Sequence, residues 1–78
     1  MAQVIPAKAV SQKPKFQFAV LSVCKDATIA ELESSFASQG QAENMFERQY
    51  SKWGLTDVNF YLVDWTKQTI LRSHEVWS

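Results

Sequence analysis

The sequence has very little of the residue types that build covalent or metal-bound frameworks. Its single cysteine, Cys24, leaves no partner for an internal disulfide. With only one histidine, His74, the chain cannot supply the Cys and His ligands that a structural zinc site requires. The sequence therefore predicts a protein without a disulfide framework or a metal site, and a reducing compartment suits a lone thiol.

Long apolar runs are also missing. The opening residues, MAQVIPAKAV, lack the apolar core of about 7 to 15 residues that marks a signal peptide. Nothing approaches the roughly 20 apolar residues of a membrane-spanning helix. We therefore expect a cytoplasmic protein that has no membrane segment.

Catalytic and ligand-binding motifs are absent from the 78 residues. His74 stands beside Glu75, but neighbouring residues of a strand point to opposite faces, so they do not form an acid–base pair. Cys24 precedes a predicted helix that could activate a thiol, yet no base lies near it in sequence. The acidic residues match neither an EF-hand loop nor an HExxH helix. We expect a non-enzymatic protein without a cofactor, and a cysteine enzyme is the alternative class.

Charge is balanced overall but unevenly distributed. Residues 1–23 carry Lys8, Lys13 and Lys15 and no acid, whereas the rest of the chain carries five basic and eight acidic residues. Residues 1–14 contain two prolines and no periodic pattern, which predicts a flexible N-terminal arm. Residues 15–78 are then one small domain, of a size that buries roughly 60% of its unfolded surface.

Periodicity predicts one strand and a helical region in the first half of this domain. Residues 15–24 alternate as a strand does, with apolar side chains on both faces. Thr28 and Glu31 have the spacing of a capping box, and the apolar residues that follow recur at helical intervals. After Gly40 the apolar stripe is about 100° out of phase. We therefore expect a break or bend near residues 38–41, which makes the region either one kinked helix or two helices.

Two further strands are predicted, at residues 58–65 and 68–77. The expected fold class is α+β, with a three-stranded antiparallel sheet in the order strand, helix, strand, strand, and with helical material on one face. Placing the last strand between the other two makes every pair of neighbours antiparallel, and we adopt that strand order.

The stretch VNFYLVDWTKQTIL, residues 58–71, suggests where function lies, because its apolar residues fall on both faces. We expect one face to meet the helices; it carries Val58, Phe60, Leu62 and Leu71. The other face must be covered by the N-terminal arm, by a second copy of the chain or by a target. Aromatic residues are enriched at protein interfaces. The partner-binding residues predicted on that face are Tyr61, Val63, Trp65, Ile70 and Arg72.

The predicted function is that of a small protein–protein interaction module, acting as an inhibitor, an adaptor or a subunit, with self-association into a homodimer as one form. Glu43 and Glu47 lie four residues apart on one helical face and are predicted to meet basic residues of the partner. By analogy alone, small inhibitors encoded by viruses or mobile elements have this size and lack of catalytic residues. The alternative is single-stranded nucleic-acid binding by sheet aromatics and the basic arm. That alternative uses Phe16, Phe18, Tyr61 and Trp65 for stacking, and Lys13, Lys15, Lys67 and Arg72 for phosphates.

Overall fold

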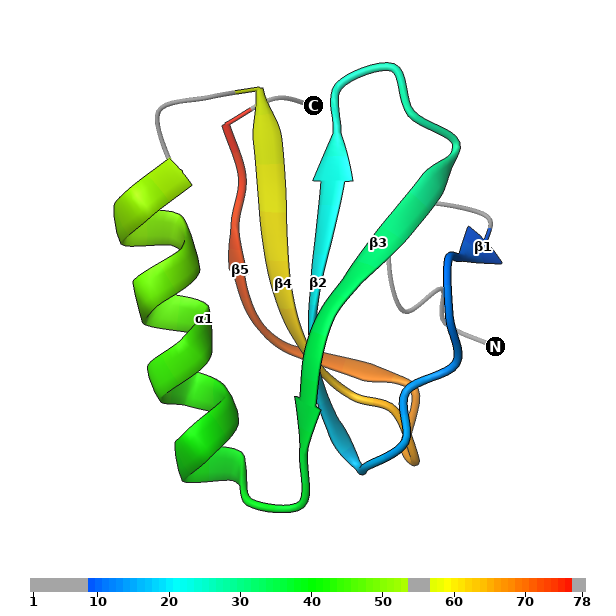
Figure 1. Ribbon diagram of the computed structural model, residues 1–78, viewed down its shortest axis with the longest axis vertical. Coiled ribbons are helices and arrows are strands. Elements are labelled where there is room, and N and C mark those ends of the chain that lie inside the picture. Colours follow the sequence, from blue (N-terminus) through cyan, green and yellow to red (C-terminus); the bar gives the residue numbers. More distant parts are fainter. Residues whose placement is uncertain (1–8, 54–56, 77–78) are drawn as a thin grey trace.

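The structure is a computed structural model that describes residues 9–53 and 57–76 (Figure 1). Its elements, in chain order, are β1 (Ala9–Val10), β2 (Phe18–Cys24), β3 (Ile29–Phe36), α1 (Gln39–Trp53), β4 (Val58–Asp64) and β5 (Thr69–His74). The α+β class is as predicted, with one helix against an antiparallel sheet. The sheet, however, has four antiparallel strands rather than three.

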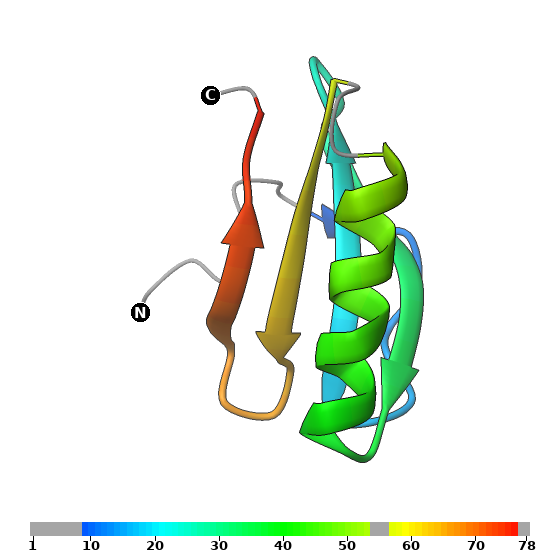
Figure 2. The same cartoon turned by 90° about the vertical axis from the view of Figure 1, so that its left-hand side faces the viewer.

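The strands lie in the order β3-β2-β4-β5, and every neighbouring pair is antiparallel. The short strand β1 adds to the outer side of β3 in parallel. Strands β2 and β4 are therefore central, and they pair without interruption from Phe18 opposite Asp64 to Cys24 opposite Val58. α1 covers one face of this twisted sheet (Figure 2).

The predicted helix over residues 28–36 is wrong, because this segment is strand β3. Ala30 is buried in the core on the sheet face opposite α1, and Leu32 packs on the same face. The acidic residues of the segment alternate with them, which is the period of a strand. Pairing with β2 from Phe18 to Ser22 satisfies the backbone of the segment, and this tertiary gain outweighs a short local helical pattern.

α1 begins where the sequence predicted a break. Ser38 caps the helix, since its Oγ accepts from the backbone N–H of Gln41 at 3.5 Å. Gly40 lies in the first turn, and the shift in apolar phase marks the change from a strand to a helix. The predicted Gly54–Leu55 cap lies outside the described residues.

The two faces of the sheet build two separate cores. Toward α1, the core contains Val20, Phe60 and Leu62 from the sheet, with Ala42 and Phe46 from the helix. Val58 packs against it, so the predicted helix-facing set is confirmed except for Leu71. The opposite face holds a second buried cluster, which consists of Ala19, Leu21, Val23, Ala30, Tyr61 and Val63.

Residues 9–14 lie against the sheet, whereas the sequence predicted a flexible arm over residues 1–14. Val10 packs on the second core, and Pro14 is buried. The backbone N–H of Ser11 donates to the carbonyl of Ala30 at 2.8 Å, and its Oγ accepts from the N–H of Leu32. This part of the arm is thus attached to β3; residues 1–8 lie outside the described residues.

β5 is an edge strand, which corrects the expectation that it lies in the middle of the sheet. Its pairing with β4 shifts at a bulge: Val63 faces Ile70 as predicted, but Leu62 faces Arg72 instead of Leu71. Leu71 is the extra residue and faces no residue of β4. The turn before β5 is longer than two residues and ends at Gln68, whose φ of 54° lies in the left-handed region.

Candidate functional site

The sheet face predicted to bind a partner is buried within the described chain. Tyr61 is 1% exposed and Val63 is 0% exposed. Trp65 is half-buried and packs on the same core together with Val10 and Leu32. The side chains of Tyr61 and Val63 are therefore closed to a partner in this conformation, contrary to the expectation that they form its docking surface.

Polar contacts close this face at the Tyr61 hydroxyl. The hydroxyl donates to Oε2 of Glu75 at 2.9 Å and accepts from Nδ2 of Asn59 at 3.3 Å. Oδ1 of Asn59 in turn accepts from the backbone N–H of Val76 at 2.7 Å. These bonds fasten the segment after β5 to β4. Burial of the phenol, and next its hydrogen bond to Glu75, raise the pKa of Tyr61 from 10.0 to about 12.

The raised pKa predicts a loss of stability in alkali. Because the folded-state pKa of Tyr61 lies above the unfolded value, its contribution is complete below pH 10 and is lost as the pH rises from about 10 to about 12. A shift of two units sets an upper limit of about 2.7 kcal/mol, which solvent near the exposed Glu75 reduces. Urea unfolding at pH 9 and pH 11 should show this loss in the wild type and not in Tyr61→Phe. The control Tyr50→Phe should keep it; an equal loss in Tyr61→Phe would contradict the assignment.

Ile70 and Arg72, the other two residues predicted on that sheet face, lie on β5 at the sheet edge. Ile70 is 40% exposed, and it is joined by Leu71 at 38% and by Val76 at 42% just after the strand. Among the described residues no strand pairs with the outer side of β5. An edge of this kind presents backbone N–H and C=O groups to any further strand. The exposed part of the predicted surface is therefore this edge.

Arg72 lies on the helix-facing side of the sheet opposite Leu62, and not on the face of Tyr61 and Val63 as the sequence predicted, because the bulge in β5 changes which face follows Ile70. Its Nη1 donates to Oε2 of Glu47 at 2.9 Å, and its guanidinium lies 5.0 Å from the centre of the Phe46 ring. The bond to Glu47 raises the pKa of Arg72, which stays charged. Next to it, the ring of His74 stacks on that of Tyr50 at 4.5 Å. These contacts hold β5 to the helix.

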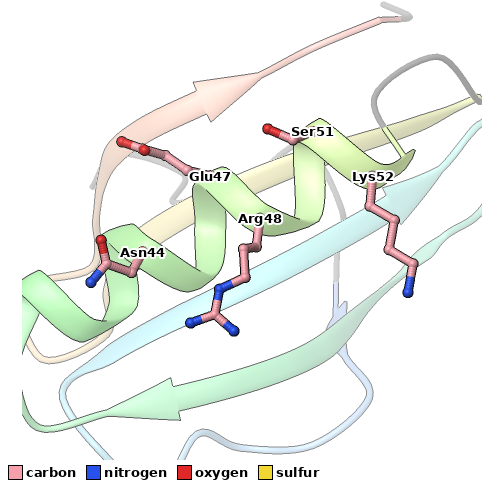
Figure 3. A pocket seen from close by; sticks show the side chains of 5 residues that line it. All are labelled: Asn44, Glu47, Arg48, Ser51 and Lys52. Carbon is pink, nitrogen blue, oxygen red and sulfur yellow. The ribbon is translucent and has the colours of Figure 1, made fainter.

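Of the two predicted acidic residues of α1, one is paired with a base and the other is bonded to a neutral amide. Glu47 pairs with Arg72, and Glu43 accepts from Nε2 of Gln39 at 2.9 Å. α1 also carries Arg48 and Lys52, whose side chains point away from that of Glu47 (Figure 3). The shallow pocket along the outer face of α1 is thus mixed in charge; its lining is Asn44, Glu47, Arg48, Ser51 and Lys52. It offers no acidic patch for a basic target.

A second depression, of about 380 Å³, lies between α1 and the end of the β2–β3 pair. Glu31 and Glu33 line it from β3, and Oγ of Ser22 donates to Oε2 of Glu33 at 2.7 Å. The exposed Cys24 lies on its β2 side. His74 lies on β5, which β4 separates from β2, and its ring stacks on Tyr50. Within residues 9–53 and 57–76, no group of three or more His, Cys, Asp or Glu residues could hold a metal ion.

The aromatic residues of the alternative nucleic-acid site are dispersed. Tyr61 is buried in the second core, and Trp65 and Phe18 pack against the two cores. Phe16 is 52% exposed, and it neighbours the β4–β5 turn because the N–H of Trp65 donates to the carbonyl of Gln17 at 2.7 Å. This brings Lys15 and Lys67 to the same end of the sheet. Of the four aromatic residues that the sequence suggested, Phe16 alone is exposed, and Lys15 and Lys67 lie near it.

Comparisons with protein-family models, with curated proteins and with solved structures found no match.

Sequence reasoning missed the importance of Leu71, because it assigned that residue to the helix-facing core. The bulge that exposes Leu71 has no clear signature in the sequence. One signal was present: Arg72 and Glu75 fit poorly in a central strand, and charged residues are typical of sheet edges.

Among the described residues, no helix is long and apolar enough to cross a membrane.

Proposed function

We propose that the protein is a non-enzymatic interaction module that binds another protein chain along edge strand β5. The observation that carries the proposal is the position of the exposed apolar residues. Five large apolar side chains are exposed among the described residues, and three of them lie on β5 or directly after it: Ile70, Leu71 and Val76. Exposed apolar side chains beside an unpaired strand edge are the usual requirements for strand addition.

In this mechanism the backbone edge supplies affinity and the side chains supply selectivity. A strand of the partner hydrogen-bonds to the outer side of β5, while its apolar side chains cover Ile70 and Leu71. The contacts of Arg72 and His74 with α1 keep β5 in place before binding, which lowers the entropic cost of association. By occupying a strand edge, the module acts as an inhibitor, an adaptor or a subunit. Single-stranded nucleic-acid binding has less support, because Tyr61 is buried in the second core and Phe18 and Trp65 pack against the two cores.

A single charge on the edge tests the proposal. Leu71→Asp should abolish capture of the partner from the source cell, because a carboxylate would be desolvated beside an apolar strand. Asn44→Asp introduces the same side chain on the exposed outer face of α1 and should leave capture unchanged. The two variants and the wild type are compared as bait, with quantitative mass spectrometry of the bound proteins and thermal unfolding as a check of the fold.

Hydrogen exchange on the purified complex then locates the contact. Amides of residues 69–74 should become protected when the partner binds, and those of α1 should not change. Partners that bind Leu71→Asp as strongly as the wild type, or protection confined to another surface, would exclude β5 as the docking edge.

A further inference from the structure

We infer that the end of the sheet at the β4–β5 turn is a peripheral contact for an anionic lipid surface. This inference goes beyond the proposed function, because it uses neither the edge of β5 nor the apolar residues exposed there. It rests on an exposed aromatic side chain, Phe16, that lies among lysines. We call this part of the molecule the basic end; it consists of residues 13–17 and 64–67.

Hydrogen bonds join the two segments of the basic end. The backbone N–H of Trp65 donates to the carbonyl of Gln17 at 2.7 Å. The carboxylate of Asp64 bridges the segments, since Oδ2 accepts from Nε2 of Gln17 at 3.1 Å and Oδ1 accepts from the backbone N–H of Lys67 at 3.1 Å. Asp64 is only 4% exposed. The backbone of the basic end is therefore held in one arrangement before anything binds.

Positive charge is in excess at this end. Lys13 and Lys15 are exposed on either side of the buried Pro14, and Lys67 is exposed in the turn. Against these three lysines stands one acid, the buried Asp64, which leaves a net charge of plus two. α1 also begins at this end of the molecule, as Figures 1 and 2 both show, and its first turn contains no acidic residue. The positive end of the helix dipole therefore adds to the field of the lysines.

The rest of the described chain has the opposite charge. Outside the basic end, residues 9–53 and 57–76 carry four basic and seven acidic residues, a net charge of minus three. Charge of opposite sign at the two parts of a molecule orients it in an external field. A negative surface therefore attracts the basic end and repels the remainder of the protein.

Phe16 gives the basic end an apolar tip. It is 52% exposed, which makes it the most exposed of the large apolar side chains that the structure describes. The neighbouring Trp65 is half-buried. Aromatic side chains enter the boundary between headgroups and acyl chains, while lysines beside them stay at the headgroups. Phe16 with Lys15 and Lys67 has this composition.

The shape of the basic end favours a lipid surface over the other anionic ligands. Single-stranded nucleic acid is held by successive bases stacked on several aromatic residues, and Phe16 is the one exposed aromatic residue of its candidate set. A small phosphate compound requires a concave site. Neither of the two depressions described above is lined by residues of the basic end, which lies at an extremity of the molecule (Figure 2). A planar surface can meet such a tip without a groove.

Vesicle sedimentation of the 78-residue chain tests the inference. The wild type should bind vesicles of phosphatidylserine and phosphatidylcholine at low salt, should not bind vesicles of phosphatidylcholine alone, and should be released at high salt. Each lysine near an anionic surface contributes about fivefold to binding, so Lys15→Glu with Lys67→Glu should lower the partition coefficient at least about 25-fold. Lys25→Glu, in the β2–β3 turn at the other end of the sheet, is the matched control and should change it less than about twofold.

The apolar part of the contact has its own pair of variants. Phe16→Ala should lower the partition coefficient about fivefold, because the methyl group that remains inserts much less apolar surface. Ile29→Ala truncates a side chain that is 48% exposed at the other end of the sheet, and should leave the partition coefficient unchanged. Circular dichroism checks that each variant is folded.

Three results would overturn the inference. The first is a wild type that does not bind the phosphatidylserine vesicles at low salt. The second is a Lys15→Glu with Lys67→Glu variant that binds them as the wild type does, which places the contact elsewhere. The third is a single-stranded oligonucleotide that binds the wild type more tightly than the vesicles do and is weakened by Phe16→Ala, which assigns the basic end to nucleic acid. Capture of a protein through β5 is tested separately by Leu71→Asp.

Discussion

Phe46→Ala should lower the free energy of unfolding by about 3–5 kcal/mol. The Phe46 ring is buried between α1 and the sheet, where it joins Val20, Phe60 and Leu62 in one core. Its removal leaves a cavity and also removes the ring beneath the Arg72 guanidinium. A domain of this size has a total stability of roughly 4–12 kcal/mol, so the variant should be close to unfolding at room temperature.

The matched control for this variant is Phe16→Ala. Phe16 is 52% exposed, so the same truncation there should cost less than about 1 kcal/mol. Urea unfolding followed by circular dichroism measures both changes. Equal losses at the two positions would mean that α1 is not anchored to the sheet through Phe46.

Val63→Lys should prevent folding, whereas Ile70→Lys should cost about 1 kcal/mol or less. The two residues are cross-strand neighbours, so the contrast isolates burial from strand propensity. Val63 is fully buried in the second core, and an unpaired ammonium there costs several kcal/mol. Ile70 is exposed at the sheet edge, where a lysine stays in water.

This pair of variants also decides which surface is open. Circular dichroism and thermal unfolding of dilute protein report on the fold of each variant. If Val63→Lys folds as stably as Ile70→Lys, the second sheet face is accessible in solution. That result would favour the face of Tyr61 and Val63 as the docking surface and would contradict the proposal for β5.

The hydrogen bonds at Tyr61 explain why a docking surface at Tyr61 and Val63 and a docking surface at β5 exclude each other. A sheet with apolar residues on both faces must cover the second face, and in this chain Val10, Leu32 and Trp65 pack there. The hydrogen bonds from Tyr61 and Asn59 then fasten the segment after β5. What remains accessible to a partner is the strand edge and not the aromatic face.

Much of the secondary structure could be predicted from local patterns. Alternation located β2, β4 and β5 to within a few residues, and the apolar stripe after Gly40 contains the residues through which α1 packs. Segment 28–36 could not be assigned this way. Its apolar residues fit both a helix and a strand, and the choice depended on pairing with β2, a contact between strands that local propensity does not encode.

The candidate site was less predictable than the fold, because it depends on strand order. Ile70 and Arg72 were correctly placed on the last strand, but their accessibility follows from β5 lying at the edge. The bulge that exposes Leu71 is likewise a feature of pairing between β4 and β5. Neither can be read from the spacing of residues along one strand.

By itself, the sequence determined the α+β class, the two-sided apolar character of the strands and the absence of a disulfide framework, since composition and short periodicities encode these properties. Only the tertiary structure decided which apolar face is covered, which strand is outermost and which charges are paired. The physical reason is that burial and hydrogen bonding depend on neighbours distant in sequence. The same residues can line a core or an interface according to what packs against them.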